Sequence, residues 1–80
     1  MSVELHRRWG RAIKVARETK GWSQSALAHR LAVRPSSVSR WEAGSCAPSD
    51  ENKLRIAEVL DIEVGDLFPL IALRSARDDH

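Results

Sequence analysis

Helical periodicity runs through the chain up to residue 68, and glycine and proline residues divide it into short segments. In residues 2–21 apolar side chains recur every three or four positions, as they do on one face of an α-helix; they are Leu5, Trp9, Ile13 and Ala16. The same kind of spacing predicts helices over residues 23–33, 35–43, 49–61 and 64–68. Because almost nothing before residue 69 alternates with the period of two that strands require, the sequence predicts an all-α domain.

The predicted helix boundaries carry residues that commonly cap helices. Ser2, Ser23 and Ser49 stand at N-cap positions, where a hydroxyl can accept a hydrogen bond from a free N–H group of the first turn. Pro35 can occupy the first turn of its helix, because no backbone partner is needed there. Gly44 can adopt the left-handed conformation that ends a helix. These signals place a helix over residues 35–43 that contains three serines and one arginine.

Composition excludes several classes of protein. The chain has 80 residues, of which 42% are hydrophobic and 30% charged, as expected for a single globular domain. No apolar run approaches the roughly 20 residues that span a bilayer, and the first residues lack the apolar core of a signal peptide, so we expect a cytoplasmic protein with no membrane partner. The single cysteine and three scattered histidines do not form a metal-ligand pattern. We therefore expect no metal and no cofactor.

Charge is distributed unevenly along the chain. Residues 1–41 contain nine lysines and arginines against two acidic residues, a net charge of +7. Residues 42–80 contain four basic residues against nine acidic ones, a net charge of −5. A basic N-terminal half indicates contact with a polyanion such as nucleic acid. The alternative is a basic surface that is only solvated.

The helix predicted for residues 35–43 has two different sides. At about 100° per residue, Val38, Trp41 and Glu42 fall on one side. The other side carries Ser36, Ser39, Arg40 and Ala43. Small polar side chains with one long cation suit a helix that enters the major groove of DNA, which is about 12 Å wide. In the following helix, Leu54, Ala57 and Leu60 are expected to face the core.

The segment from Gly21 to Gly44 resembles the helix-turn-helix of the phage-repressor and Cro family, also called the XRE family. The resemblance extends over about residues 8–68 and rests on Gly21, Ser23, Gln24, Leu27, Ala28, Leu31, Val33, Val38, Ser39, Trp41, Glu42, Gly44, Pro48, Leu54, Ala57, Leu60, Ile62 and Leu67. It implies a compact five-helix, lambda-repressor-like DNA-binding domain over residues 1–68. Ala32 occupies a turn position that is usually glycine in this family, so a positive φ there would be strained.

The resemblance also implies roles in DNA binding. Ser36 and Arg40 match positions that read base edges, and arginine paired with guanine is the commonest specific contact. Gln24 matches a glutamine that reaches a phosphate and braces the recognition helix. Ser37 and Ser39 are candidates for contacts with a phosphate or a thymine methyl, and Arg34 for the phosphate backbone. Each of these residues could instead be an ordinary exposed polar residue.

Glu42 is acidic yet close to this predicted DNA-binding surface. The helical wheel turns it inward, and the family resemblance pairs it with Arg17. We therefore predict a structural ion pair between Arg17 and Glu42 rather than two DNA contacts.

A short tail, residues 69–80, follows the region of resemblance. Its apolar residues Leu70, Ile71 and Leu73, together with Leu67, predict an exposed patch that forms a two-fold dimer contact, before an end that we expect to be disordered. The alternative is that the tail folds back onto its own domain.

These features predict a sequence-specific regulator of transcription that binds double-stranded DNA. The leading hypothesis is a repressor that docks on a palindromic operator as a homodimer. One alternative is an antitoxin of the same fold, with a toxin protein as its main partner and autoregulatory DNA binding; another is an adaptor that binds only protein. An enzyme is not expected, because the sequence contains no nucleophile-and-base set, phosphate loop or metal cluster.

Overall fold

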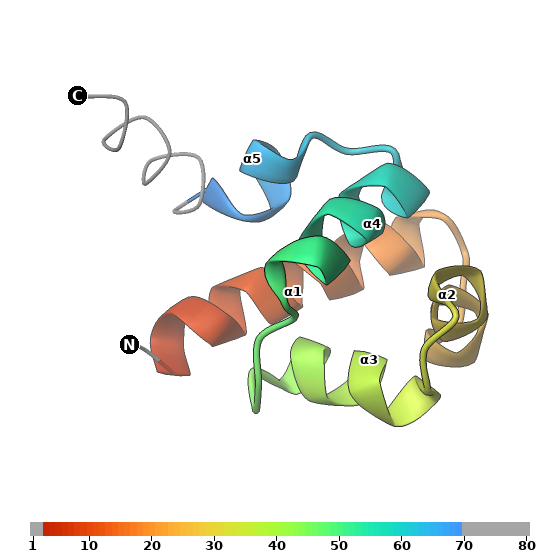
Figure 1. Ribbon diagram of the computed structural model, residues 1–80, viewed down its shortest axis with the longest axis horizontal. Helices are drawn as coiled ribbons and strands as arrows, with labels where there is room; N and C mark the ends of the chain where they lie inside the picture. The colour runs from red at the N-terminus through yellow and green to blue at the C-terminus, as the bar shows by residue number, and fades with distance from the viewer. Residues whose placement is uncertain (1–2, 70–80) are drawn as a thin grey trace.

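The computed structural model describes residues 3–69, which contain five α-helices joined by short turns and loops (Figure 1). They are α1 (Val3–Thr19), α2 (Gln24–Leu31), α3 (Pro35–Ala43), α4 (Asp50–Leu60) and α5 (Val64–Leu67). No strand occurs among these residues, so the predicted all-α, five-helix fold is confirmed. None of the helices in the described part is long and apolar enough to cross a membrane.

Local capping interactions set the helix boundaries, as the sequence predicted. Ser23 Oγ accepts a hydrogen bond from Ala26 N at 3.0 Å at the start of α2, and Ser49 caps α4 in the same way. Pro35 is the first residue of α3, and Gly44 ends that helix with a φ of 79°. The predicted N-cap Ser2 lies outside the described residues.

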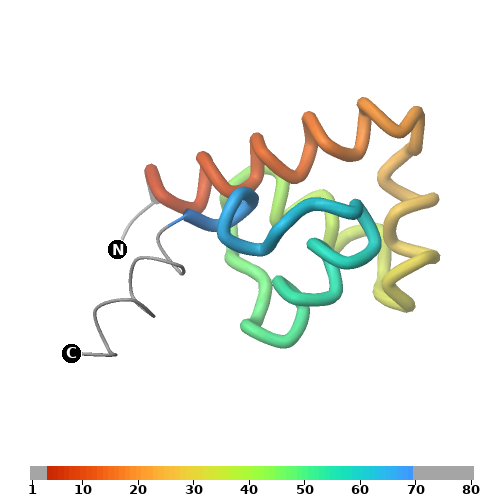
Figure 2. The backbone as a smooth tube through the Cα atoms, turned by 90° about the horizontal axis from the view of Figure 1, so that it is seen from above, coloured from red at the N-terminus to blue at the C-terminus, as the bar shows by residue number. Residues whose placement is uncertain are grey.

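The helices enclose a single apolar core, and α1 packs against α3, α4 and α5. Figure 1 shows α3 on one side of α1 and α5 on the other, while α2 stands at the C-terminal end of α1; Figure 2 confirms that position of α2 from above. The largest fully buried side chains come from all parts of the described chain: Ile13, Leu27, Leu31, Val38, Ile56, Leu60 and Phe68. The core therefore supports α3 from beneath.

The buried face of α4 differs from the predicted one. Ala57 and Leu60 are buried as expected, but Leu54 is 60% exposed, and Lys53 and Ile56 are buried instead. Lys53 can be buried because its alkyl stem packs like an apolar side chain. Its ammonium nitrogen lies 4.2 Å from the centre of the Trp9 ring and 3.5 Å from Asp50 Oδ1. The aromatic ring and the carboxylate both stabilise the positive charge of Lys53.

The prediction of an exposed patch that includes Leu67 is wrong for that residue. Leu67 is only 3% exposed, and it belongs to the core together with Phe68, which packs edge-on against Trp9. A helix as short as α5 is held in place by burying these two residues against the other helices. The other predicted patch residues, Leu70, Ile71 and Leu73, lie outside the described residues.

The turn after α2 contains a strained residue. Ala32 has φ 58° and ψ 42°, a left-handed conformation that disfavours residues with a Cβ. We expect Ala32→Gly to raise the free energy of unfolding by about 0.5 to 1 kcal/mol, because relief of strain exceeds the extra entropy of the unfolded chain. Chemical denaturation measures the change. The control Ala43→Gly, at the last residue of α3, should instead lower stability, by at most about 1 kcal/mol; a loss of stability in both variants would contradict the prediction.

Candidate nucleic-acid interface

Helix α3 presents a polar surface above a buried apolar one. Val38 is fully buried and Trp41 is 5% exposed, so the underside of the helix is fixed in the core. On the other side Ser36, Ser39 and Arg40 are exposed, as the helical wheel predicted. The predicted contact residue Ser37 is half-buried, and Arg34, directly before the helix, is exposed.

The polar groups on this surface are not used within the fold. Across residues 3–69, no side-chain hydrogen bond or ion pair involves the predicted contact residues of α3 and its N-cap, which are Arg34, Ser36, Ser37, Ser39 and Arg40. Arg34 is the N-cap residue but makes no side-chain capping bond. A cation at a helix N-terminus is disfavoured by the helix dipole, whereas an anion placed there is attracted by both the dipole and the arginine.

A buried polar network joins α1, α2 and α3 beneath one end of this surface. Arg17 makes a two-pronged contact with Glu42, with Nε to Oε2 at 2.7 Å and Nη2 to Oε1 at 3.0 Å. The Arg17 side chain is 8% exposed and that of Glu42 is 4% exposed. The structure thus contains the ion pair between the two residues that the sequence suggested.

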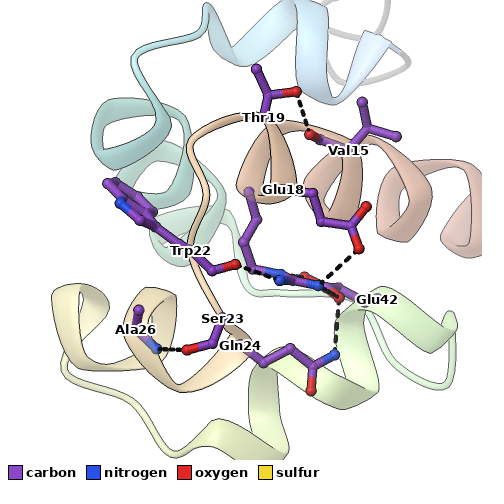
Figure 3. Close-up of polar contacts among 9 residues, drawn as sticks. Val15, Glu18, Thr19, Trp22, Ser23, Gln24, Ala26 and Glu42 are labelled. Carbon is purple, nitrogen blue, oxygen red and sulfur yellow. Dashed lines mark hydrogen bonds and ion pairs between the residues drawn. The ribbon is translucent and has the colours of Figure 1, made fainter.

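The same network extends to the start of α2. Gln24 Nε2 donates a hydrogen bond to Glu42 Oε1 at 2.9 Å, and Arg17 Nη1 donates to the Trp22 carbonyl at 2.6 Å (Figure 3). Gln24 therefore braces the first turn of α2 against α3, which agrees with the bracing part of its predicted role. The phosphate contact predicted for Gln24 stays a prediction.

Charge in the network is well compensated. The hydrogen bond to Glu42 raises the pKa of the Arg17 guanidinium above its usual value, although burial acts in the opposite direction. Glu18 contributes a weaker contact, with 3.8 Å between its Oε2 and Arg17 Nη2, and its side chain is 55% exposed. Glu42 thus lies in the interior as half of an ion pair, so it does not present a free negative charge next to α3.

A close backbone contact between α1 and α3 was missed in the sequence. At Gly10, in the middle of α1, a Cβ would lie 2.3 Å from the Trp41 carbonyl oxygen and 2.6 Å from that of Glu42. Gly10 therefore lets α1 approach the last turn of α3 more closely than any other residue could. A lone glycine inside a helical pattern was the signal that could have indicated this contact.

The basic residues of α1 do not all belong to the surface of α3. Arg7 lies against Gly44, at the C-terminal end of α3, where an added Cβ would be 2.8 Å from Arg7 Cγ. Arg8, Arg11 and Lys20 instead line a groove with Leu60 and Leu67 of α4 and α5. The net charge of residues 1–41 therefore predicts more cations on the exposed surface of α3 than the structure places there.

Comparison with known proteins matches this geometry. Residues 13–67 match the family model described as helix-turn-helix. The uncharacterized HTH-type transcriptional regulator YazB of Bacillus subtilis strain 168 is 34% identical over 61 residues, which are 76% of this chain and 88% of YazB.

Two solved structures have the same fold over most of their length. The restriction-modification controller protein C.AhdI from Aeromonas hydrophila is 34% identical, with a TM-score of 0.75 over 84% of this chain and 100% of that chain. The clp gene regulator ClgR from Corynebacterium glutamicum is 28% identical, with a TM-score of 0.76 over 94% of this chain and 84% of that chain. With its exposed α3, its braced α2 and these matches, the chain belongs to the XRE-type helix-turn-helix family of transcriptional regulators.

Proposed function

We propose that this protein is a sequence-specific regulator that binds double-stranded DNA with α3 in the major groove. The observation that carries the proposal is the surface of α3, where exposed serines and Arg40 have no partner within residues 3–69 and lie above a buried apolar underside. Short hydroxyl side chains allow the helix axis to come close to the bases, and Arg40 is long enough to reach a guanine edge.

The predicted contact residues divide into two roles. Arg40 and Ser36 read base edges, and Ser39 and Ser37 contact a thymine methyl or a phosphate. Gln24 and Arg34 stand at the N-termini of α2 and α3, where free backbone N–H groups also attract phosphate. Phosphate contacts of this kind set the position of α3, while the base contacts give the sequence preference.

We further propose that the protein acts in the cytoplasm as a homodimer that represses transcription by occupying a palindromic operator. In this arrangement residues 1–68 form the DNA-binding domain and residues 69–80 contribute to dimerisation. Selection of bound duplexes from a random pool tests the proposal: a two-fold symmetric site with half-sites about 34 Å apart is the expected result. Recovery of no preferred sequence at low salt would contradict it.

Arg40→Ala is expected to weaken binding to the selected duplex by about 1 to 3 kcal/mol and to relax preference at one base pair per half-site. The matched control is Arg11→Ala, which removes the same charge from an exposed position of α1, in the groove that α1 forms with Leu60 and Leu67. The control should cause only a small loss that is the same for all sequences. Binding titrations with the selected duplex and single-base variants measure both effects; a uniform loss for Arg40→Ala would show that Arg40 contacts only the backbone.

A further inference from the structure

A basic groove lies between α1 and the end of α4, and the proposed function leaves it without a role. It has a volume of about 660 Å³, and its walls come from α1, the turn after α4, and α5. At about 100° per residue, Arg8 and Ala12 of the groove are each about 160° around α1 from Gly10, which touches α3. Figure 1 likewise shows α3 and α5 on different sides of α1. A segment bound in the basic groove therefore leaves the surface of α3 free.

The floor of the basic groove is apolar and partly open to solvent. Val15 is 57% exposed, although it is a large hydrophobic residue, and Ala12 and Ile62 are half-buried. Leu60 and Leu67, which are almost fully buried, close the floor from below. Apolar surface gathered in a groove is typical of a place where another molecule binds.

The rim of the basic groove has an excess of positive charge that the fold does not neutralise. Arg8, Arg11 and Lys20 line it together with one carboxylate, that of Asp66. Among residues 3–69 none of these four side chains is ion-paired, and Lys20 makes only a cation–π contact, 5.7 Å from the centre of the Trp22 ring. Because the groove is on the far side of α1 from α3, the proposed DNA contacts do not account for these cations.

The spacing of the cations favours a long ligand over a small one. From Arg8 to Lys20, just after the end of α1, the rim extends about 18 Å at 1.5 Å per residue. A fatty acid has one carboxylate, so it neutralises only one part of such a rim. A helix of about twelve residues spans the same distance and can carry several carboxylates along its length.

We propose that the basic groove binds an acidic amphipathic α-helix of another protein. The apolar side of that helix covers Val15 and Ile62, and its carboxylates pair with the cations of the rim, a mode of recognition in which a helix lies in a groove. Arg8 and Arg11 suit this role, because a guanidinium pairs with a carboxylate through two parallel hydrogen bonds. The inference does not depend on the proposed homodimer.

Segments of this chain match the basic groove less well than a separate acidic helix does. Residues 70–80 contain two arginines and two aspartates, Arg74, Arg77, Asp78 and Asp79, so these side chains bring no net negative charge. Helix α4 is acidic in its first turn, but it buries its apolar side in its own core, and Leu54 is its one exposed large apolar residue. Charge and apolar surface together therefore favour a partner of a different sequence.

A synthetic peptide tests the proposal with the full chain at about 0.15 M salt. The peptide has leucines at every third or fourth position, glutamates beside them and alanines elsewhere; it has about 18 residues, because shorter isolated helices are marginal in water. Fluorescence anisotropy of the labelled peptide is expected to show saturable binding that becomes at least about tenfold weaker for Arg8→Glu/Arg11→Glu and for Val15→Asp. A peptide with lysine in place of each glutamate should bind the wild type at least about tenfold more weakly.

The matched control is Arg7→Glu/Lys14→Glu, which reverses two exposed charges of α1 outside the basic groove. It should change the affinity for the acidic peptide by less than about threefold, because salt screens charges that are more than about 8 Å apart. All substituted positions are exposed, so circular dichroism should show that every variant is folded. An equal loss in the control and in Arg8→Glu/Arg11→Glu would show only a general attraction between opposite charges and would overturn the proposal.

Other occupants of the basic groove give different results. Binding of dodecanoate without binding of the peptide would identify a small-ligand site and overturn the proposal. Sedimentation equilibrium should give the same mass for Arg8→Glu/Arg11→Glu as for the wild type; a lower mass would show that a second copy fills the groove, which would also overturn it.

Binding to DNA separates this inference from the proposed function. The peptide should bind the complex with the selected duplex and the free protein with affinities within about threefold, because the basic groove and α3 lie on different sides of α1. Competition between peptide and duplex would contradict this placement of the partner. A protein that binds the peptide but selects no duplex would contradict the proposed function and not this inference.

Discussion

Glu42→Ala is expected to lower the free energy of unfolding by about 3 to 5 kcal/mol, which is a large part of the stability of a domain this small. The substitution leaves the buried Arg17 guanidinium with the Trp22 carbonyl as its main partner, and it removes the acceptor of Gln24 Nε2. A buried cation without its counter-charge is costly, because it has lost its water and gains little in return. Urea denaturation followed by tryptophan fluorescence measures the loss.

The control for this prediction is Glu18→Ala, on the same Arg17. Glu18 is exposed and 3.8 Å from the guanidinium, so its removal should cost less than about 0.5 kcal/mol. Because Glu42 points into the network and not toward DNA, Glu42→Ala should keep the order of preference among duplexes when it is measured well below its melting temperature. Unchanged melting with an altered order of preference would contradict the assignment of Glu42 to the interior.

The parts of the fold that the sequence predicted depend on local interactions. Capping by Ser23 and Ser49, the first-turn position of Pro35 and the end at Gly44 involve residues only a few positions apart. The division of α3 into a buried and an exposed side also follows from periodicity alone, because Val38 and Trp41 are its only large apolar residues. Prediction of the ion pair between Arg17 and Glu42 needed the family resemblance as well as periodicity, because the two residues are 25 positions apart in the sequence.

The parts that the sequence could not predict depend on how the helices pack. Periodicity classes Lys53 as a polar residue that faces solvent, although it packs on Trp9 and is buried. For this reason the sequence predicted that Leu54 faces the core, whereas Leu54 is exposed. The four residues of α5 form only one turn, which is too short for periodicity to show that Leu67 faces the core. From the sequence, Gly10 is only a residue of low helix propensity; its role is visible once α3 packs against it.

Gly10→Ala is expected to destabilise the fold by about 3 kcal/mol, the upper end of the usual cost of overpacking. Alanine would gain about 1 kcal/mol over glycine in an isolated helix, so the sign of the effect depends on the contact with α3. A Cβ at Gly10 would lie 2.3 Å from the Trp41 carbonyl oxygen, whereas close contacts between carbon and oxygen are about 3.3 Å or longer. The atoms in the way belong to the backbone, so α1 and α3 must separate by about 1 Å to accommodate it.

The control Ala12→Gly makes the reverse exchange two residues further along α1, where it should cost about 1 kcal/mol through helix propensity. Arg40 directly precedes Trp41, so a displaced last turn of α3 also moves the residue proposed to read a base. We therefore expect Gly10→Ala to weaken binding to the selected duplex more than binding to a random duplex, measured at a temperature where the variant is folded. Thermal denaturation that shows a gain in stability for Gly10→Ala would mean that α1 and α3 do not touch through this glycine. In that case the position of α3 would depend on the Arg17 and Glu42 network and the apolar underside alone.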